Sequence, residues 1–402
     1  MSAHTDTQGR TRPLQGTFTL PDNDPEHVFE TYAELRTTRP AAYTEDLGGY
    51  WALTRFEDVR AAAADSETYI SSVKAVVPSD PRGIRRPPLN FDAPRHTPFR
   101  RALNRTLAPG RVAALSGRIS ARAETLFEEF IGGEEDDIAR TFGTLLPAYA
   151  EAIWLNLDSE RVAWLAQTAT AWVDAWRRQD AGQVTRHSEA MYEVARWLVA
   201  DRRLNPRDPR EDPASSLLSE RVDGVALDEE HIVGALRQSL VVGMVAPPLL
   251  IGGIARHLAL DHELHRQLRS GAVPLKSALE EFLRMYTPYR GFSRTVSRPT
   301  ELAGELLLPG EPVTLVYAAA NRDPNEFPQP DRFDASRPNL NRHLGFGRGR
   351  HQCVGQHLAR GIVGAALEVL VHRSTRLELL GEPEPTRMPE LGYQSVRVRV
   401  LQ

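Results

Sequence analysis

A glycine-rich segment that brings the only cysteine of the chain to the start of an apolar helix constrains this protein more than any other feature. Residues 346–355 read FGRGRHQCVG, and residues 356–371 carry apolar side chains at helical spacing. The N-terminus of a helix favours the thiolate form of Cys353, and a thiolate is the form that ligates haem iron. The glycines let the loop approach a flat cofactor closely. A lone cysteine is more often an inert buried residue, so the pattern around Cys353 carries the interpretation as a haem ligand.

The bulk composition is that of an ordinary globular protein. The chain has 402 residues, 41 % hydrophobic and 25 % charged, and its formal net charge of -4 gives no reason to expect nucleic-acid binding. Its length alone favours more than one domain. One cysteine excludes a disulfide within the chain and fits a reducing, cytoplasmic setting. Residues 1–20 begin with a polar stretch, and we expect them to form a disordered tail.

The stretch between Arg237 and Arg256 has no charged residue. Its length is at the lower edge for a membrane-spanning helix. It contains Pro247 and Pro248, however, and lies deep inside a sequence of ordinary globular composition. We therefore predict a buried core helix and no membrane anchor.

The pattern of apolar residues predicts a mainly helical chain with small sheets and no regular alternation of strands and helices. The clearest helical segments are 24–37, 113–131, 168–176, 190–199, a central helix around Val242, 275–286 and a helix directly after Cys353. Short strands are predicted around 42–43, 50–53 and 397–401. Residues 301–316 read as strand, turn and strand, with Pro309-Gly310 as the turn.

Three motifs occur in an order that points to one family. Glu281 and Arg284 form a Glu-x-x-Arg pair on a predicted helix, a proline-rich segment at 327–333 follows, and the Cys353 loop comes last. In these features the chain resembles the cytochrome P450 family. The resemblance implies a mainly α (α+β) fold, with a large helical region and small β-sheets in one catalytic domain at residues 21–402. It also implies haem b as the cofactor, with Cys353 as the axial ligand of its iron.

The same resemblance assigns roles to further residues. Glu281, Arg284 and Arg332 are expected to form a buried ion network that fixes the cysteine loop. Haem carries two carboxylates, and burying them requires cationic donors. The haem contacts that the resemblance implies are His96, Arg100, Arg294, His351, Phe346, Gly347 and Gly355.

The centre of the chain departs from the family. Most P450s carry an acid and a threonine where this sequence has Val245 and Ala246. Neither side chain relays a proton, and the prolines that follow remove backbone donors and should distort the helix. Three interpretations stay open: a monooxygenase with protons from substrate or ordered water, an enzyme that uses peroxide, and a reaction without dioxygen such as dehydration, rearrangement or nitrogen-group transfer.

The family positions also suggest a distal substrate pocket. Its expected members are Val242, Gly243, Met244, Val245, Ala246, Pro247, Arg290, Phe292 and Tyr393. Arg290 either binds a substrate carboxylate or points into solvent.

The resemblance implies an oxidoreductase of the monooxygenase type that acts on a small or medium organic substrate, as in secondary metabolism. We expect electrons from a separate ferredoxin-type partner that docks near Arg348, Arg350 and Arg101. The alternative from another class is a haem sensor or carrier without turnover, in which Met244 is a second ligand of the iron.

Overall fold

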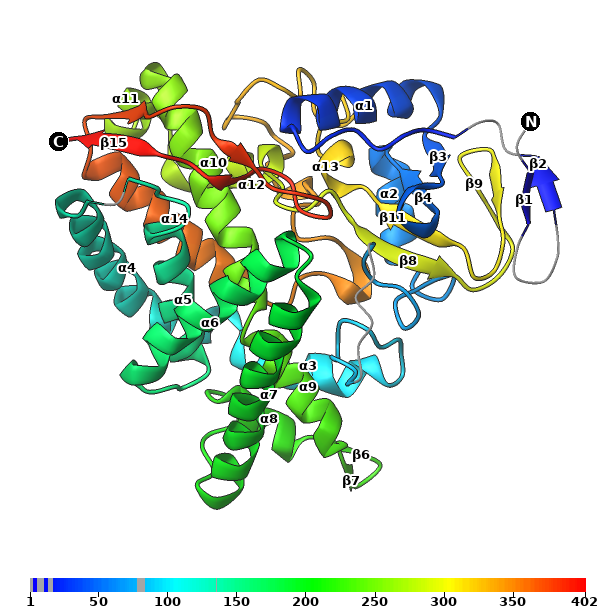
Figure 1. The fold of residues 1–402 in the computed structure, drawn as a ribbon, viewed down its shortest axis with the longest axis horizontal. Coiled ribbons are helices and arrows are strands. Elements are labelled where there is room, and N and C mark those ends of the chain that lie inside the picture. Colours follow the sequence, from blue (N-terminus) through cyan, green and yellow to red (C-terminus); the bar gives the residue numbers. More distant parts are fainter. Residues whose placement is uncertain (1–2, 6–10, 14–16, 78–83, 135) are drawn as a thin grey trace.

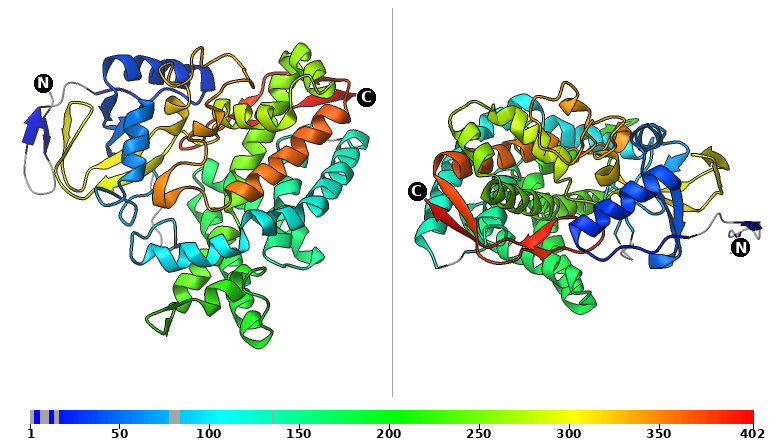
Figure 2. Two further views of the ribbon diagram at one scale, coloured as in Figure 1. Left: turned by 180° about the vertical axis from the view of Figure 1, so that it is seen from behind. Right: turned by 90° about the horizontal axis from the view of Figure 1, so that it is seen from above.

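A computed structural model describes residues 3–5, 11–13, 17–77, 84–134 and 136–402. A helical part and a sheet part lie side by side, with the N-terminus at the sheet end and the C-terminus at the helical end (Figure 1). The two views in Figure 2 show the same division from behind and from above. The predicted mainly helical fold with small sheets is confirmed.

The helical part contains most of the helices. In chain order they are α3 (His96–Thr106), α4 (Pro109–Gly132), α5 (Phe142–Trp154), α6 (Ser159–Arg177), α7 (Ala181–Leu204), α8 (Pro213–Ser219), α9 (Glu229–Ser239), α10 (Ala246–Leu260), α11 (His262–Arg269), α12 (Leu275–Met285) and α14 (Gln356–His372). Aspartates accept backbone N–H groups at the starts of several of them, as Asp158 does for α6 and Asp228 for α9. These caps explain why the helices begin where they do.

The main sheet has the strand order β3-β4-β11-β8-β5. Its strands are β3 (Ala41–Thr44), β4 (Tyr50–Leu53), β11 (Pro312–Leu315), β8 (Phe292–Val296) and β5 (Tyr69–Ile70). Only the central pair, β4 and β11, is parallel. The helices α1 (Pro25–Thr38), α2 (Phe56–Ala64) and α13 (Tyr317–Ala320) pack beside this sheet.

The remaining strands form two-stranded sheets. They are β1 (Ala3–Thr5) with β2 (Thr11–Pro13), β6 (Arg221–Val222) with β7 (Val225–Ala226), β9 (Thr300–Leu302) with β10 (Glu305–Leu307), β12 (Arg376–Leu379) with β15 (Val398–Leu401), and β13 (Glu384–Pro385) with β14 (Tyr393–Ser395). The prediction that residues 301–316 form one strand-turn-strand unit is wrong in the position of the turn. The tight hairpin turn is Ala303-Gly304, both with positive φ, whereas Pro309-Gly310 connects β10 to β11.

The prediction of a disordered tail over residues 1–20 is wrong where the structure describes this segment. Residues 3–5 and 11–13 pair as β1 and β2, and residues 17–20 contact the domain. Phe18 is buried and donates its backbone N–H to Tyr43 O at 2.9 Å, and Leu20 donates to Asp46 Oδ2 at 2.8 Å. Residues 17–20 therefore belong to the folded domain, because β3 supplies a backbone partner that a disordered tail lacks. The predicted disorder of residues 1–2, 6–10 and 14–16 lies outside the described residues.

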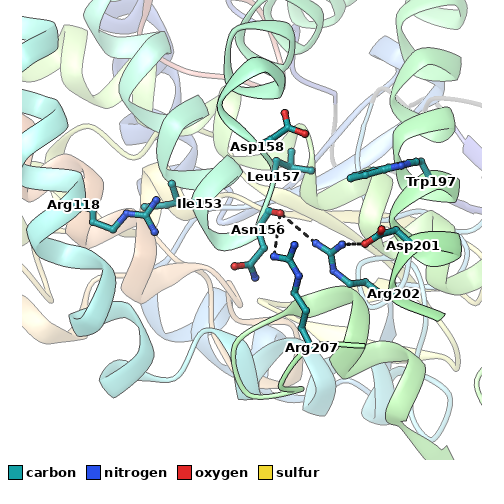
Figure 3. Close-up of a pocket in the computed structure, with 9 residues that line it drawn as sticks. All are labelled: Arg118, Ile153, Asn156, Leu157, Asp158, Trp197, Asp201, Arg202 and Arg207. Carbon is teal, nitrogen blue, oxygen red and sulfur yellow. Dashed lines mark hydrogen bonds and ion pairs between the residues drawn. The ribbon is translucent and has the colours of Figure 1, made fainter. Parts of the chain in front are cut away.

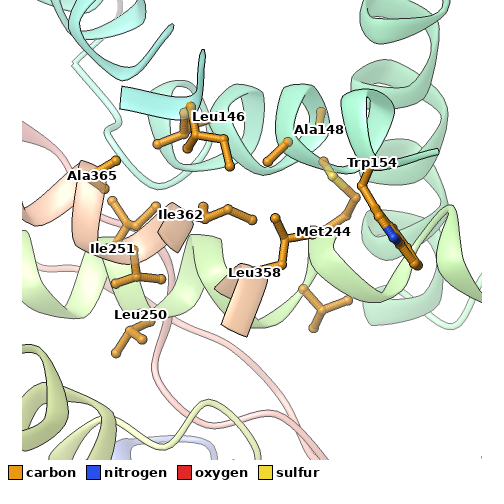
Figure 4. Packing of buried hydrophobic residues seen from close by; sticks show 14 of the residues in the cluster. Leu146, Ala148, Trp154, Met244, Leu250, Ile251, Leu358, Ile362 and Ala365 are labelled. Carbon is orange, nitrogen blue, oxygen red and sulfur yellow. The ribbon is translucent and has the colours of Figure 1, made fainter. Parts of the chain in front are cut away.

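The uncharged central stretch is a core element. Residues 229–260 are long and apolar enough to cross a membrane, but 78 % of their most apolar window is buried inside the protein. The stretch forms α9, the short 3-10 helix η2 (Val242–Met244) and α10. Figure 4 shows Leu146 of α5, Ile251 of α10 and Ile362 of α14 in one group of buried side chains, so three helices share this core.

Ile251→Ala should destabilise the fold because its side chain is fully buried between α5, α10 and α14. We expect a loss of about 2–5 kcal/mol in the free energy of unfolding. The matched control is Leu204→Ala, since Leu204 is 82 % exposed; it should change stability by less than about 0.5 kcal/mol. Denaturant unfolding followed by circular dichroism measures both, and equal stability of the two variants would contradict the packing described.

Candidate functional site

Cys353 lies half-buried between the 3-10 helix η4 (Gly349–His351) and the start of α14. Its backbone N–H donates to Phe346 O at 2.8 Å, which closes the loop. Burial raises the pKa of the thiol, while the Gly355 N–H and the charge of Arg100 lower it. Gly349 has φ +74° and a Cβ there would collide with the Ala63 carbonyl, so the loop needs glycine at this position.

Helix α12 carries a buried ion network. Arg284 donates to Glu281 from Nε and Nη2, both at 2.7 Å, and both side chains are fully buried. The third arginine of the network is Arg337, whose Nε lies 3.0 Å from Glu281 Oε1. The prediction of Arg332 is wrong, because that side chain is exposed and reaches only Gln329.

The local backbone explains why Arg337 takes this place. The Asp334 N–H donates to Glu281 Oε1 at 2.9 Å, so the segment after Arg332 turns towards α12. Arg337 also donates from Nη1 to Pro328 O and from Nη2 to Gln329 O and Arg332 O. A guanidinium whose three nitrogens all donate hydrogen bonds can be buried beside a carboxylate.

The same helix holds both ends of the cysteine loop. Arg284 donates to Asn321 O at 2.8 Å, and the Asn321 side chain accepts the Leu344 N–H at 2.6 Å. The neighbouring Glu280 accepts from Arg360 of α14 at 2.7 Å, and Arg360 lies over the Phe346 ring. These contacts fix the loop before and after Cys353.

The pKa of Glu280 reflects these cations. Burial alone would raise it, but the hydrogen bonds from His343 and Arg360 lower the pKa to about 2. Glu280 is therefore ionised at neutral pH and forms a charged tie between α12 and α14.

The predicted cationic groups converge on one side of the cysteine loop. The rings of His96 and His351 are 4.6 Å apart, and the charges of Arg100 and Arg294 both act on His351. Burial, followed by the positive charges of His351, Arg100 and Arg350, lowers the pKa of His96 to about 4. Among the described residues, neither Arg100 nor Arg294 forms an ion pair with a carboxylate, and the buried Nε2 of His96 has no hydrogen-bond partner.

This donor set fits a haem. Two arginines without carboxylate partners and an orphaned histidine nitrogen suit the two propionates of the cofactor. The glycine loop beside Cys353 supplies room for a flat ring: Gly347 has φ +65°, and a Cβ there would lie 3.3 Å from the Tyr317 hydroxyl. Tyr317 itself interacts with Arg294.

The central stretch breaks at the predicted place. Helix α9 ends at Ser239 and α10 begins at Ala246, with η2 between them. Pro247 and Pro248 occupy the first turn of α10, where their missing N–H groups cost nothing, but they prevent the helix from continuing backwards through Gly243. The prolines thus turn one long helix into two.

The break presents its side chains in two directions. Val242 of η2 is 47 % exposed, and Ala246 at the start of α10 is half-buried. Met244 and Val245 are buried on the other side. Figure 4 shows the Met244 side chain between Ala148 and Trp154 of α5. This packing contradicts Met244 as a second ligand of the iron, because its sulfur lies in the apolar core.

The remaining residues predicted for the distal pocket, Arg290, Phe292 and Tyr393, have different neighbours in the structure. Arg290 is 1 % exposed and donates to Asp22 O at 3.2 Å and Asn23 Oδ1 at 3.1 Å. The alternative in which Arg290 points into solvent is wrong, because the segment before α1 covers its side chain. Its buried Nε has no hydrogen-bond partner among the described residues, and binding of a substrate carboxylate stays a prediction. Phe292 packs against Tyr289, with ring centroids 5.0 Å apart. Tyr393 lies under Arg256, 5.0 Å from its guanidinium.

Two cavities lie outside the cysteine loop. One, of about 350 Å³, is lined by residues of α4, α5 and α7 and by three arginines (Figure 3), and none of the predicted site residues contributes to it. A smaller cavity of about 70 Å³ is lined by Met244, Pro248, Leu249 and Tyr393 among others. Neither is lined by Cys353.

A buried acid that the sequence reasoning missed lies against the break. Glu151 of α5 is 4 % exposed, and the Gly243 N–H donates to its carboxyl group. Burial raises the pKa of Glu151 to about 8, and the hydrogen bond from Gly243 only partly offsets this. Its sequence signal is a single charged residue in an otherwise uncharged helix.

Comparison with known proteins decides the family. The family model for cytochrome P450 matches residues 263–396, which contain the ion network and the cysteine loop. A mycinamicin IV hydroxylase/epoxidase from Micromonospora griseorubida is 32 % identical over 365 residues, covering 88 % of this chain and 89 % of the relative. The chain belongs to the cytochrome P450 family.

Further P450s agree in sequence and fold. A linalool 8-monooxygenase from Pseudomonas putida is 29 % identical over 87 % of this chain and 89 % of its own length. The crystal structure of CYP108D1 from Novosphingobium aromaticivorans is 29 % identical and superimposes with a TM-score of 0.81 over 93 % of this chain and 94 % of that one. The chain is thus a P450 monooxygenase of organic substrates, and the cofactor of the family is a haem with a thiolate ligand.

Arg337→Ala and Arg332→Ala separate the two candidates for the P450 ion network. Removing Arg337 leaves part of the buried Glu281 charge unpaired and should cost about 3–5 kcal/mol of unfolding free energy. Removing the exposed Arg332 should change it by less than about 0.5 kcal/mol. Thermal unfolding of the haem-loaded proteins, with haem content measured in parallel, compares them. A larger loss for Arg332→Ala would contradict the network.

Proposed function

We propose that this P450 oxidises a small or medium-sized organic molecule, with Cys353 as the thiolate ligand of haem b. The observation that carries the proposal is the convergence of the glycine loop, the start of α14 and the unpaired cations around Cys353. When bound, a haem with a thiolate ligand activates dioxygen, so that one oxygen atom enters the substrate and the other becomes water.

The residues around the loop have separate tasks in this proposal. Arg100 and Arg294 hold the propionates, and their charges offset those carboxylates in a buried site. His96 and His351 lie beside them as hydrogen-bonding groups, because burial lowers the pKa of both imidazoles. Phe346, Gly347 and Gly355 shape the proximal surface, and the Gly355 N–H stabilises the Cys353 thiolate. Glu281, Arg284 and Arg337 keep the loop in place.

The substrate should be largely apolar. Val242, Ala246 and Phe292 are the members of the distal set with exposed or half-buried apolar side chains. Two relatives are named for oxidation of mycinamicin IV and of linalool. By analogy we assign this chain to secondary metabolism, with hydroxylation or epoxidation as the reaction.

Electrons would come from a separate ferredoxin-type protein in the cytoplasm. Arg348 and Arg350 are exposed beside the Cys353 loop and suit an acidic partner. Arg101, expected in the same patch, is instead tied to Glu220 at 2.8 Å, so it contributes less free positive charge. The docking surface is therefore centred on the loop itself.

The spectrum of the reduced carbon-monoxide complex tests the haem ligand. The wild-type protein should show the red-shifted band that thiolate ligation gives, and Cys353→His should lose it, because imidazole replaces sulfur at the iron. His372→Ala, at the far end of α14, is the control and should keep the band. Retention of the band in Cys353→His would contradict the assignment.

The double variant Arg348→Glu/Arg350→Glu tests the docking surface. Reduction by a plant-type ferredoxin should slow by roughly 10-fold or more at low salt, and the difference should shrink as ionic strength rises. Arg376→Glu/Arg399→Glu changes the same charge on β12 and β15 and should leave the rate unchanged. Stopped-flow reduction kinetics measures both. Equal rates in the two double variants would place the docking site elsewhere.

A further inference from the structure

The break between α9 and α10 carries no side chain that relays protons at Val245 or Ala246, but a buried carboxyl group lies next to it. Val245 and Ala246 occupy the acid and threonine positions, and both are apolar. Glu151 is the only charged residue of α5. It meets the broken helix at Gly243, directly before the residues that lack the relay.

The packing between α5 and the break is specific for this carboxyl. A Cβ added at Gly243 would overlap Glu151 Oε1 and lie 2.6 Å from the carboxyl carbon. Figure 4 shows the neighbouring Met244 between Ala148 and Trp154, the residues three before and three after Glu151 on α5. Residues three apart share a helix face, so this face of α5 is the one turned to η2. Gly243 is therefore the position that leaves room for the acid.

The carboxyl group is only partly satisfied. Its Oε2 is buried and has no hydrogen-bond partner in the part of the chain that the structure describes. No cation of the described residues acts on it; the Gly243 N–H is the one group that favours its charged form. A buried carboxyl without a counter-charge is costly unless it has a function or remains protonated.

We propose that Glu151 supplies protons to the distal pocket, in place of the acid and alcohol that most P450s carry at the positions of Val245 and Ala246. The inference rests on the monooxygenase function proposed above. The Glu151 carboxyl lies beside Gly243 and does not touch the reacting atoms. Glu151 is therefore a positioning residue: it holds the proton at the edge of the distal pocket.

The proposed step is the transfer of one proton from the Glu151 carboxyl group. The Glu151 O–H bond breaks, the proton passes into the distal pocket, and the electron pair stays on the carboxylate, where the Gly243 N–H stabilises it. A proton from solvent then restores the acid. Each dioxygen that is cleaved with insertion of one atom into substrate consumes two protons, together with two electrons from the external reductant.

Two properties support Glu151 in this role. Its raised pKa keeps the group protonated at neutral pH yet close enough to neutrality to release the proton. Its carboxyl group also fills the space at Gly243, which comes shortly before Val245 and Ala246 in the break of the central stretch.

Glu151→Gln is the decisive variant, because the amide keeps the shape and neutrality of the protonated acid but has no proton to give. The experiment supplies the holoenzyme with dioxygen, ferredoxin and ferredoxin reductase but no organic substrate, and measures the products of dioxygen reduction. The share of consumed dioxygen that ends as water, instead of superoxide or peroxide, should fall by roughly 10- to 100-fold. Glu151→Asp should restore part of it. Trp154→Phe, which removes a buried hydrogen bond to Thr106 from the same helix, is the matched control and should behave like wild type.

A second readout does not depend on turnover. The infrared spectrum of the wild type at neutral pH, minus that of Glu151→Gln, should show the C=O stretching band of a protonated carboxyl group. Equal water shares in wild type and Glu151→Gln would overturn the inference, and so would the absence of the protonated band. If Glu151→Gln does not bind haem, the wild-type infrared spectrum decides.

The outcomes separate this inference from the function on which it rests. A protein that lacks the red-shifted carbon-monoxide band contradicts the haem-thiolate proposal. A protein that has this band but whose water share does not depend on Glu151 contradicts the proton supply alone, and assigns Glu151 to a structural hydrogen bond with Gly243.

Discussion

The buried carboxylate of Glu281 is the interaction on which the proximal half of this P450 depends. It receives the guanidinium groups of Arg284 and Arg337 and the backbone N–H of Asp334. The charges are removed from water, so their pairing is favourable only because nearly every donor and acceptor is used. Such a network adds little stability beyond an apolar core, but the loss of one member leaves an uncompensated charge. Its contribution is therefore to fix one arrangement of the chain.

The Glu281 network is connected to the Cys353 loop by a short series of hydrogen bonds. Arg284 holds the Asn321 carbonyl, Asn321 holds Leu344, and Glu280 holds Arg360 on the far side of the loop. The loop between Leu344 and Arg360 is thereby tied at both ends to one helix. A metal ligand on such a loop is positioned by rigid elements although it does not lie on one itself.

The distal half follows from a different constraint. Two consecutive prolines at the start of α10 prevent a continuous helix, and Gly243 in the gap has no side chain to fill the space opposite α5. The carboxyl of Glu151 occupies that space. The break in the central stretch and the acid on the neighbouring helix are thus linked by packing, since a larger residue at Gly243 would exclude the acid.

Much of this could be predicted from the sequence, because the deciding signals are local. The loop around Cys353 and the pair of Glu281 and Arg284 each depend on spacing along a single segment. Arg332 was chosen wrongly over Arg337 because both follow the proline-rich segment, and only the turn at Asp334 decides which one returns to α12. The surroundings of Arg290 and Glu151 could not be predicted, because their partners, Asn23 and Gly243, are brought to them by tertiary folding.

We propose that the iron of this P450 is held by the sulfur of Cys353, on the loop that α12 fixes. X-ray absorption spectroscopy at the iron edge of the purified holoprotein measures the ligands of the iron. We expect one sulfur scatterer in the first coordination shell of the wild-type protein and none in Cys353→Ala. A first shell made only of nitrogen and oxygen in the wild-type protein would contradict ligation by Cys353.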